Sequence, residues 1–457
     1  MQYISTRDAN RRVSASQAIV AGISPDGGLF LPEEIPQVTP EELSALCAAD
    51  YPHRAANILA RFLTDFTESE LLSYAEKAYA REKFPPREVA PVVSIGDNGH
   101  VLELFHGPTS AFKDFALQML PHLLTASLRK NGETRTVIIL VATSGDTGKA
   151  ALEGFADVPG TKICVFYPHG GTSSMQRLQM TTQRGENVMV SAVRGNFDDA
   201  QTGVKALFTD EAYLAELAAR GYLLSSANSI NWGRLAPQIA YYYSAYCDLA
   251  GAGKIRMGEK INVCVPTGNF GNILAAWYAK HSGLPIARLI CASNRNNVLS
   301  DFLSTGVYDK NRAFHLTTSP SMDILVSSNL ERLLSLTLED EAQLKSLMAA
   351  LKTEGRYEIS AQARRKLQAE FACGWADDEA VAAEIAETFA RDGYLPDTHT
   401  AVGLRVWREY RRRTGDETPT VLAATASPFK FCPAILGALG KPVPEGDFER
   451  LSALSRE

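Results

Sequence analysis

From about residue 136 onward, short and continuously apolar runs alternate with longer segments whose apolar residues recur at helical spacing. Runs that are apolar at every position and rich in β-branched residues are typical of strands buried on both faces of a parallel sheet. Runs close to this pattern, with most positions apolar, occupy residues 136–142, 162–168, 187–193, 261–266, 287–293 and 420–427. Strand and helix patterns at this spacing predict an open α/β fold, in which ligands bind at the carboxyl ends of the strands.

Two segments depart from this alternation. Residues 1–90 show mostly helical patterns around a turn and a short strand in ISPDGGLFLPEEIP, and a proline-rich stretch marks their end. Residues 331–392 carry a succession of helical patterns, one of which can end at Gly355. The sequence therefore predicts a mixed, mostly helical N-terminal domain over residues 1–90 and a helical insertion over residues 331–392.

Composition and charge restrict the class of partner. The chain has 457 residues, 45% of them hydrophobic, and a formal net charge of -6. Nucleic acids and anionic membranes require a concentrated basic surface, so we expect neither as a partner. No apolar run approaches the roughly 20 residues that span a bilayer, and the N-terminus lacks the apolar core of a signal peptide. Seven cysteines scattered singly favour a reducing compartment and no metal site, so we expect a cytoplasmic protein.

A Gly-rich turn after the first apolar run, ATSGDTGKA, is close to a nucleotide-binding P-loop. A P-loop needs Gly six residues before its Lys and Ser or Thr directly after it, but the chain has Thr143 and Ala150 at these positions. We therefore do not expect ATP. The turn can bind a small anion at a helix N-terminus through Ser144, Thr147 and nearby N–H groups. Alternatively, it is a plain strand–turn–helix connection capped by Asp146 or Thr147, which is the better interpretation of the turn alone.

A second strand–turn–helix segment is INVCVPTGNFGNILAAW. Its turn consists of Gly268, Asn269, Phe270, Gly271 and Asn272. The two glycines allow the backbone N–H groups to point at one phosphate, with the dipole of the following helix behind them. Two such turns at the ends of predicted strands indicate an anionic cofactor and an anionic substrate that face each other.

A lysine in an apolar setting is the third candidate. Lys113 lies between Phe112 and Phe115 in ELFHGPTSAFKDFALQML. A single lysine usually lays its stem along the surface and keeps its ammonium in water. A lysine held among aromatic rings has a lowered pKa, however, which an amine that forms a Schiff base needs. An amine nucleophile together with a phosphate-binding turn indicates pyridoxal phosphate (PLP) as the cofactor.

The combination of motifs resembles threonine synthases, within the fold-type-II, tryptophan-synthase-β-like PLP enzymes. The motifs include FHGPTSAFKDFALQ, ATSGDTGKAAL, PTGNFGN, SPSMDILVSSNLERLL and TASPFKF, and the resemblance runs from end to end. It implies an α/β fold of two open, mostly parallel domains. The large PLP-binding domain would comprise residues 91–135 and 231–457 with the helical insertion, and the small domain residues 136–230. We expect a monomer or a small homo-oligomer.

The resemblance also assigns site residues. It implies that Lys113 binds PLP as a Schiff base, that the turn from Gly268 to Asn272 holds the cofactor phosphate, and that Thr425 meets the pyridine nitrogen, with Ser427 as the second choice. The opening turn, with Ser144, Asp146 and Thr147, would bind the substrate and receive its α-carboxylate. Related enzymes often carry Asn at position 146, near the cofactor's 3′-oxygen, whereas threonine synthases of this group resemble the chain in having Asp. An ionised carboxylate repels a phenolate, so the partner of the 3′-oxygen stays open.

The implied reaction is the last step of threonine biosynthesis, which converts O-phospho-L-homoserine and water to L-threonine and phosphate. The substrate amine would displace Lys113, which then serves as the general base. Arg234 is the candidate for the substrate phosphate, with Asn231 beside it, although a buried structural ion pair is an alternative role for this arginine. Two other functions stay open: a phospho-lyase of the same fold that releases a 2-oxo acid, and a non-catalytic amino-acid sensor, which predicts loss of Lys113.

Overall fold

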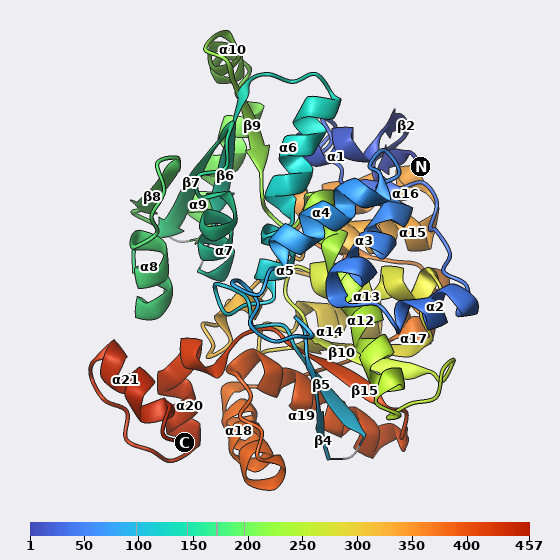
Figure 1. Ribbon diagram of the computed structural model, residues 1–457, viewed down its shortest axis with the longest axis vertical. Coiled ribbons are helices and arrows are strands. Elements are labelled where there is room, and N and C mark those ends of the chain that lie inside the picture. The colour runs from blue at the N-terminus through green and yellow to red at the C-terminus, as the bar shows by residue number, and fades with distance from the viewer. Residues whose placement is uncertain (97, 144, 171, 196) are drawn as a thin grey trace.

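Two open sheets form the framework of the protein (Figure 1). The computed structural model describes residues 1–96, 98–143, 145–170, 172–195 and 197–457. The larger sheet has the order β14–β11–β10–β15–β5–β4 and is parallel except for β4, which runs antiparallel to β5. Its strands are β4 (Val92–Ile95), β5 (Gly99–Glu103), β10 (Ile261–Pro266), β11 (Ile286–Ser293), β14 (Phe371–Trp375) and β15 (Thr420–Ala424).

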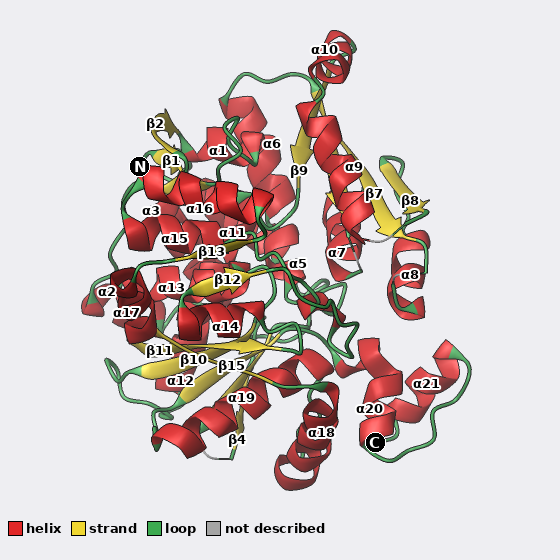
Figure 2. Cartoon of the chain, turned by 180° about the vertical axis from the view of Figure 1, so that it is seen from behind, coloured by secondary structure: helices red, strands yellow, loops and turns green. Residues whose placement is uncertain are grey.

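The smaller sheet is parallel throughout and has the order β8–β7–β6–β9. Its strands are β6 (Thr136–Ala142), β7 (Thr161–Pro168), β8 (Val188–Val193) and β9 (Tyr222–Ser226). Helices α7 (Asp146–Phe155) and α9 (Phe197–Thr209) cover its opposite faces, as the front and back views show (Figures 1 and 2). Along β6, Ile139 and Val141 pack into the main core on the α7 side, while Leu140 and Ala142 pack with Val204 of α9. Burial on both faces explains why this strand is apolar at every position after Thr136.

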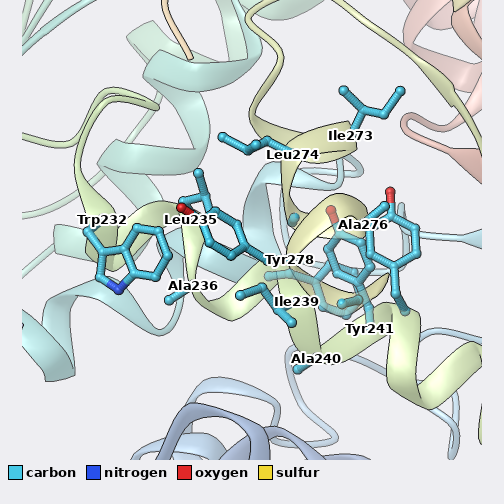
Figure 3. Packing of buried hydrophobic residues seen from close by; sticks show 14 of the residues in the cluster. Trp232, Leu235, Ala236, Ile239, Ala240, Tyr241, Ile273, Leu274, Ala276 and Tyr278 are labelled. Carbon is cyan, nitrogen blue, oxygen red and sulfur yellow. The ribbon is translucent and has the colours of Figure 1, made fainter. Parts of the chain in front are cut away.

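The larger sheet is also covered on both faces. Helix α19 (Thr398–Thr414) packs along one face, and α18 (Asp378–Asp392) and α20 (Cys432–Ala438) lie outside it. The other face is covered by α12 (Pro237–Gly251), α13 (Gly271–His281), α14 (Val298–Thr305) and α17 (Ala361–Glu370). The short helix α11 (Trp232–Leu235) leads into α12, and its Trp232 ring meets Tyr278 of α13 edge-on with centroids 5.2 Å apart. Figure 3 shows these buried side chains of α11 and α12 packed beside those of α13.

The N-terminal region packs on the same core. It contains β1 (Tyr3–Ser5), β2 (Asp8–Val13) and β3 (Phe30–Pro32), with helices α1 (Ala15–Ala21), α2 (Pro40–Leu46), α3 (Tyr51–Phe62) and α4 (Glu68–Ala78). Ser14, Thr39 and Thr67 form capping boxes that begin α1, α2 and α4. Helix α3 packs on α12, so the N-terminal helices and the helices behind the larger sheet share one hydrophobic core. The division of the chain into domains stays a prediction.

The remaining helices and strands connect these layers. They are α5 (Lys113–Leu117), α6 (Leu120–Lys130), α8 (Ser174–Thr181), α10 (Glu211–Ala219), β12 (Val307–Asp309), η1 (Pro320–Met322), α15 (Leu330–Leu338), α16 (Glu341–Thr353), β13 (Arg356–Glu358), η2 (Pro428–Phe431) and α21 (Asp447–Leu454). Within the described ranges, no helix is long and apolar enough to cross a membrane.

All six strands expected from continuous apolar runs are present, and the mostly parallel α/β fold is confirmed. The prediction of a helical insertion over residues 331–392 was incomplete, because this segment also contains the strands β13 and β14. Strand β14 pairs with β11 at the edge of the larger sheet. It was missed because its sequence FACGW follows α17 without a turn and is interrupted by a glycine, so it lacks the continuous apolar run of a central strand.

Candidate active site

The end of β15 meets the start of α5. The N–H of Phe112 donates to the carbonyl of Thr425 over 2.9 Å, and the N–H of Ser427 donates to the carbonyl of Ser110 over 3.1 Å. These bonds place Lys113, the first residue of α5, at the carboxyl end of β15. Strand β10, which carries the glycine turn, is the neighbour of β15 in the sheet. Candidate residues from three distant parts of the chain therefore converge at one edge.

Lys113 is buried, with 8% of its surface exposed. Its Nζ lies 4.6 Å from the centroid of the Phe112 ring and 3.6 Å from Oδ2 of Asp146. The pKa of Lys113 is lowered to about 8, mainly by burial. The Asp146 carboxylate raises this pKa, and the positive charges of Arg234 and Lys430 lower it further. An amine with this pKa is about one-tenth neutral at pH 7, far more than an ordinary lysine with a pKa near 10.4, which suits a Schiff-base lysine.

Asp146, the first residue of α7, is surrounded by donors. Its Oδ1 lies 2.7 Å from Nζ of Lys430 and accepts from Nε2 of Gln176 over 2.9 Å, and its Oδ2 accepts from Oγ of Ser321 over 3.3 Å. Burial by itself raises the pKa of Asp146, but the ammonium groups of Lys430 and Lys113 hold it well below its usual range. Protein donors engage both oxygens, and this arrangement favours an electrostatic role for Asp146 at Lys113. The substrate contact expected from the sequence stays a prediction.

Lys430 of η2 was not identified as a site residue from the sequence, although it lies in the motif SPFKF. Its ammonium pairs with Asp146 and also donates to the carbonyl of Thr109 over 2.9 Å. The N–H and hydroxyl of Thr109 donate in turn to the carboxylate of Asp114. A signal was available, since Lys430 lies between two phenylalanines much as Lys113 does.

The opening turn forms the N-terminus of α7. The hydroxyl of Thr143 accepts from the N–H groups of Gly145 and Gly148, both over 3.0 Å, which orders the turn. The N-cap residue Gly145 has no side chain, and no described residue accepts from the N–H groups of Asp146 and Thr147, so these two are available to an anion. The predicted contact through Ser144 lies outside the described residues. Lys149 is an early helix residue that pairs with Glu153 over 2.9 Å.

Arg234 and Asn231 have different roles. Arg234 is 4% exposed; its Nη1 donates to the carbonyl of Ala227 over 2.9 Å, and its Nη2 to the hydroxyl of Thr147 over 3.4 Å. Burial lowers its pKa to about 10. Among the described residues no carboxylate forms an ion pair with Arg234, so the alternative of a structural ion pair finds no partner there. A buried guanidinium aimed at the opening turn is suited to an anionic ligand.

Asn231, by contrast, is a helix N-cap and not a free donor. Its Oδ1 accepts from the N–H of Gly233 over 2.9 Å at the start of α11. Its Nδ2 donates to the carbonyls of Ile19 and Ser226 over 3.0 and 3.1 Å. The substrate contact predicted for Asn231 therefore has no support in the structure, which uses both ends of this amide to position α11.

The glycine turn presents its N–H groups and turns its carbonyls away. The carbonyl of Gly268 accepts from Oγ of Ser327 over 2.8 Å, and the carbonyl of Asn269 accepts from Nδ2 of Asn329 over 3.0 Å. Phe270 has a left-handed backbone with φ of 63°, and α13 begins at the next residue without a side-chain cap from the described residues. The turn therefore leaves the first N–H groups of a helix free for an anion such as a phosphate.

Asn272, at the start of α13, holds an unpaired donor. Its Oδ1 accepts from the hydroxyls of Tyr241, over 2.8 Å, and Tyr242. Its Nδ2 is buried and has no hydrogen-bond partner among the described residues. A buried amide group without a partner costs free energy unless a ligand satisfies it. This donor beside the open helix N-terminus fits the phosphate of PLP.

Segment 321–332 supports the glycine turn from behind. Nε of the fully buried Arg332 donates to the carbonyl of Phe30 over 2.8 Å, its Nη2 donates to the carbonyl of Ile230 over 2.5 Å, and its Nη1 contacts Oδ1 of Asn329. Because Asn329 also holds the carbonyl of Asn269, one arginine links β3, the segment before α11 and the turn. This linkage gives a structural reason for the motif SSNLERLL.

Ser321 and His399 complete the support and were not assigned from the sequence. His399 donates from Nδ1 to Asp397 over 2.7 Å, so its Nε2 accepts from the N–H of Ser321 over 3.1 Å. The carbonyl oxygen of Ser321 in turn faces Gly268, where a β-carbon would lie 2.8 Å from it. His399 therefore has a hydrogen-bonding role, and it holds Ser321 in place beside the glycine turn.

Thr425 follows β15 directly and is buried. The described part of the chain offers its hydroxyl no hydrogen-bond partner, whereas Oγ of Ser427 accepts from the N–H of Phe429 at the start of η2. Of the two hydroxyls considered for the pyridine nitrogen, Thr425 is therefore the free one. Lys113, the glycine turn and Thr425 together fit PLP.

We expect Gly268→Ala to weaken PLP binding. The added methyl group would lie 2.8 Å from the backbone carbonyl of Ser321, so the turn must shift. Overpacking of this kind costs about 1–3 kcal/mol, which corresponds to about a 5- to 150-fold higher Kd. Titration of the cofactor-free protein with PLP measures the change. Gly437→Ala is the matched control, because nothing lies within 4 Å of its new methyl group. An unchanged Kd for Gly268→Ala would contradict this description of the turn.

Comparisons with known proteins agree with this geometry. The model described as "Pyridoxal-phosphate dependent enzyme" matches residues 100–426, "Threonine synthase N terminus" matches residues 2–79, and "Threonine synthase, C-terminal" matches residues 400–457. The solved structure of PLP-bound threonine synthase from Brucella melitensis superposes with a TM-score of 0.89 at 40% identity, over 99% of this chain and 94% of that one.

Two curated relatives extend the comparison. Threonine synthase-like 1 of Homo sapiens is 42% identical over 96% of this chain, and the chain spans 60% of the length of that relative. Threonine synthase of Pseudomonas aeruginosa is 40% identical, over 95% of this chain and 90% of that protein. From this similarity over nearly its whole length, we conclude that the chain belongs to the threonine synthase family of PLP-dependent enzymes.

Proposed function

We propose that this protein is a threonine synthase, which converts O-phospho-L-homoserine and water to L-threonine and phosphate. The observation that carries the proposal is the set of buried charges at the site. Lys113, Lys430 and Arg234 are cations, and Asp146 is the carboxylate placed among them. Such a site favours a ligand with several negative charges, and both PLP and a phosphorylated amino acid meet this requirement.

The two ends of the substrate have separate binding partners in this proposal. The α-carboxylate binds at the N-terminus of α7, where no described residue accepts from the N–H groups of Asp146 and Thr147. The phosphate binds the Arg234 guanidinium, whose planar donors suit phosphate oxygens. Arg234 donates to Thr147 of the same turn, which links the two binding groups.

Lys113 performs the proton transfers. When bound, PLP supplies an electron sink that makes the substrate's α-proton removable. The Lys113 amine is then the base that accepts this proton, and a pKa of about 8 leaves enough of it neutral near physiological pH. The Asp146 carboxylate, held ionised, stabilises the ammonium that results. The neutral hydroxyl of Thr425 would interact with the pyridine nitrogen more weakly than a charged group would. The cofactor would then withdraw electrons from the substrate less strongly.

A product assay tests the proposal. The PLP-loaded protein is incubated with O-phospho-L-homoserine, and phosphate, L-threonine and 2-oxobutyrate are measured in parallel. We expect phosphate and threonine in equal amounts. Release of 2-oxobutyrate in place of threonine would identify the phospho-lyase instead. Absence of phosphate release from a PLP-loaded protein would contradict both functions and favour the amino-acid sensor.

A further inference from the structure

Two buried lysines share one buried carboxylate at the site. Nζ of Lys430 lies 2.7 Å from Oδ1 of Asp146, and Nζ of Lys113 lies 3.6 Å from Oδ2. The exposed fractions of the three residues are 5% for Lys430, 8% for Lys113 and 4% for Asp146. The closer and more buried ammonium therefore belongs to Lys430, the lysine to which the proposed reaction assigns no step.

The two lysines differ in how they are held. Lys430 also donates to the carbonyl of Thr109, and Thr109 is fixed by two hydrogen bonds to Asp114. Its ammonium is therefore anchored on both sides. In contrast, Lys113 must be neutral when its nitrogen attacks PLP and when it accepts a proton. A buried carboxylate that loses its counter-ion is strongly destabilised, so Asp146 needs a cation that stays charged throughout.

We propose that Lys430 is the permanent counter-ion of Asp146 and thereby a positioning residue that leaves the amine of Lys113 free to lose its proton. This inference rests on the role proposed above for Lys113 as the reactive amine. Lys430 keeps the carboxylate ionised and in place in front of Lys113, while its own positive charge repels a proton on the neighbouring amine.

The charged groups that face Lys113 determine the direction of the expected effect. They are Asp146 on α7, Arg234 on α11 and Lys430 on η2, with Asp114 on α5 facing Lys430. Loss of the Lys430 charge removes a repelling cation and leaves Asp146 to pair with Lys113 alone. Both changes favour the protonated form of Lys113, so its titration moves to higher pH.

Competitive labelling of lysines tests this proposal without substrate or PLP. The full-length, cofactor-free protein is treated briefly with acetic anhydride from about pH 6 to about pH 11.5, a range that includes the ordinary lysine midpoint near pH 10.4. The modification of Lys113 is then quantified by mass spectrometry. We expect the wild-type midpoint near pH 8. Lys430→Met should raise it by at least about one unit, so that labelling near neutral pH falls about tenfold. Lys430→Arg, which keeps the charge, should leave the midpoint within about 0.3 units.

An unchanged midpoint in a folded Lys430→Met protein would overturn the proposal. If that variant does not fold, the double variant Asp146→Asn/Lys430→Met removes both buried charges, and we expect it to fold with a midpoint at or below that of the wild type. A raised midpoint in the double variant would also overturn the proposal, because the effect would then not act through Asp146. If Lys113 of the wild-type protein labels with the expected midpoint but the protein binds no PLP, the proposed function is contradicted and the role of Lys430 is not.

Discussion

Lys113→Ala is expected to abolish covalent PLP binding and to lower the rate of threonine formation by at least about 10³-fold. The variant removes the amine that binds the cofactor and the base that moves the protons, and a positioned base alone contributes about 10²–10⁴-fold. Non-covalent binding of PLP at the glycine turn should persist, because its N–H groups and Asn272 do not depend on Lys113. Absorption spectra before and after borohydride, together with the product assay, measure both effects.

The control for this variant is Lys149→Ala. Lys149 belongs to the turn that is close to a P-loop, but it pairs with Glu153 along α7 and has no role in the proposed chemistry. We expect the activity of Lys149→Ala to stay within about twofold of the wild type. Exposed or partly exposed ion pairs contribute about 1 kcal/mol at most to the stability of a protein. Retention of a borohydride-sensitive band in Lys113→Ala would refute the assignment of Lys113.

Arg234→Met should lower kcat/KM for O-phospho-L-homoserine by about 10²-fold or more while PLP still binds. The guanidinium is buried, faces the opening turn and has no carboxylate partner among the described residues. Removal of one member of a buried, hydrogen-bonded charge pair costs about 2–5 kcal/mol, and about 3 kcal/mol corresponds to about 10²-fold. Steady-state kinetics give the activity, and the absorption spectrum gives the cofactor content.

Arg234→Lys is the conservative control. It keeps the charge but not the planar pair of donors, so we expect partial recovery of kcat/KM relative to the methionine variant. Because Arg234 neutralises no protein carboxylate in the described part of the chain, both variants should remain folded, which circular dichroism can check. If Arg234→Met has wild-type kinetics, the substrate phosphate binds elsewhere.

Much of the fold could be predicted from sequence because its central strands are buried on both faces. β6 and β10 have the bounds that their apolar runs predict. β5 and β9 were missed because their segments, GHVLE and YLLSS, are short and mix polar with apolar positions. β14 was missed because it continues directly from a helix. Short strands of mixed polarity depend on pairing with their neighbours more than on their own pattern.

Some residues of the site could also be predicted from the sequence, and others could not. Lys113 and the glycine turn could be predicted, because an apolar lysine and a Gly-rich turn are local signals. Lys430 could not be paired with Asp146 from sequence, since the two residues are distant in the chain and the ion pair exists only in three dimensions. Sequence analysis likewise expected Asn231 to contact the substrate. The structure shows that its side chain caps α11, a contact that the sequence does not reveal. Spacing along the chain does not say whether a polar side chain is already engaged by the protein.

Reduction of the Schiff base identifies the lysine that binds PLP. The PLP-loaded protein is reduced with borohydride and digested, and the modified peptide is identified by mass spectrometry. We expect the phosphopyridoxyl group on Lys113. Lys430 is the informative comparison, because both ammonium groups border the same carboxylate. An unmodified Lys113, or the phosphopyridoxyl group on Lys430, would show that Lys113 is not the lysine that binds PLP.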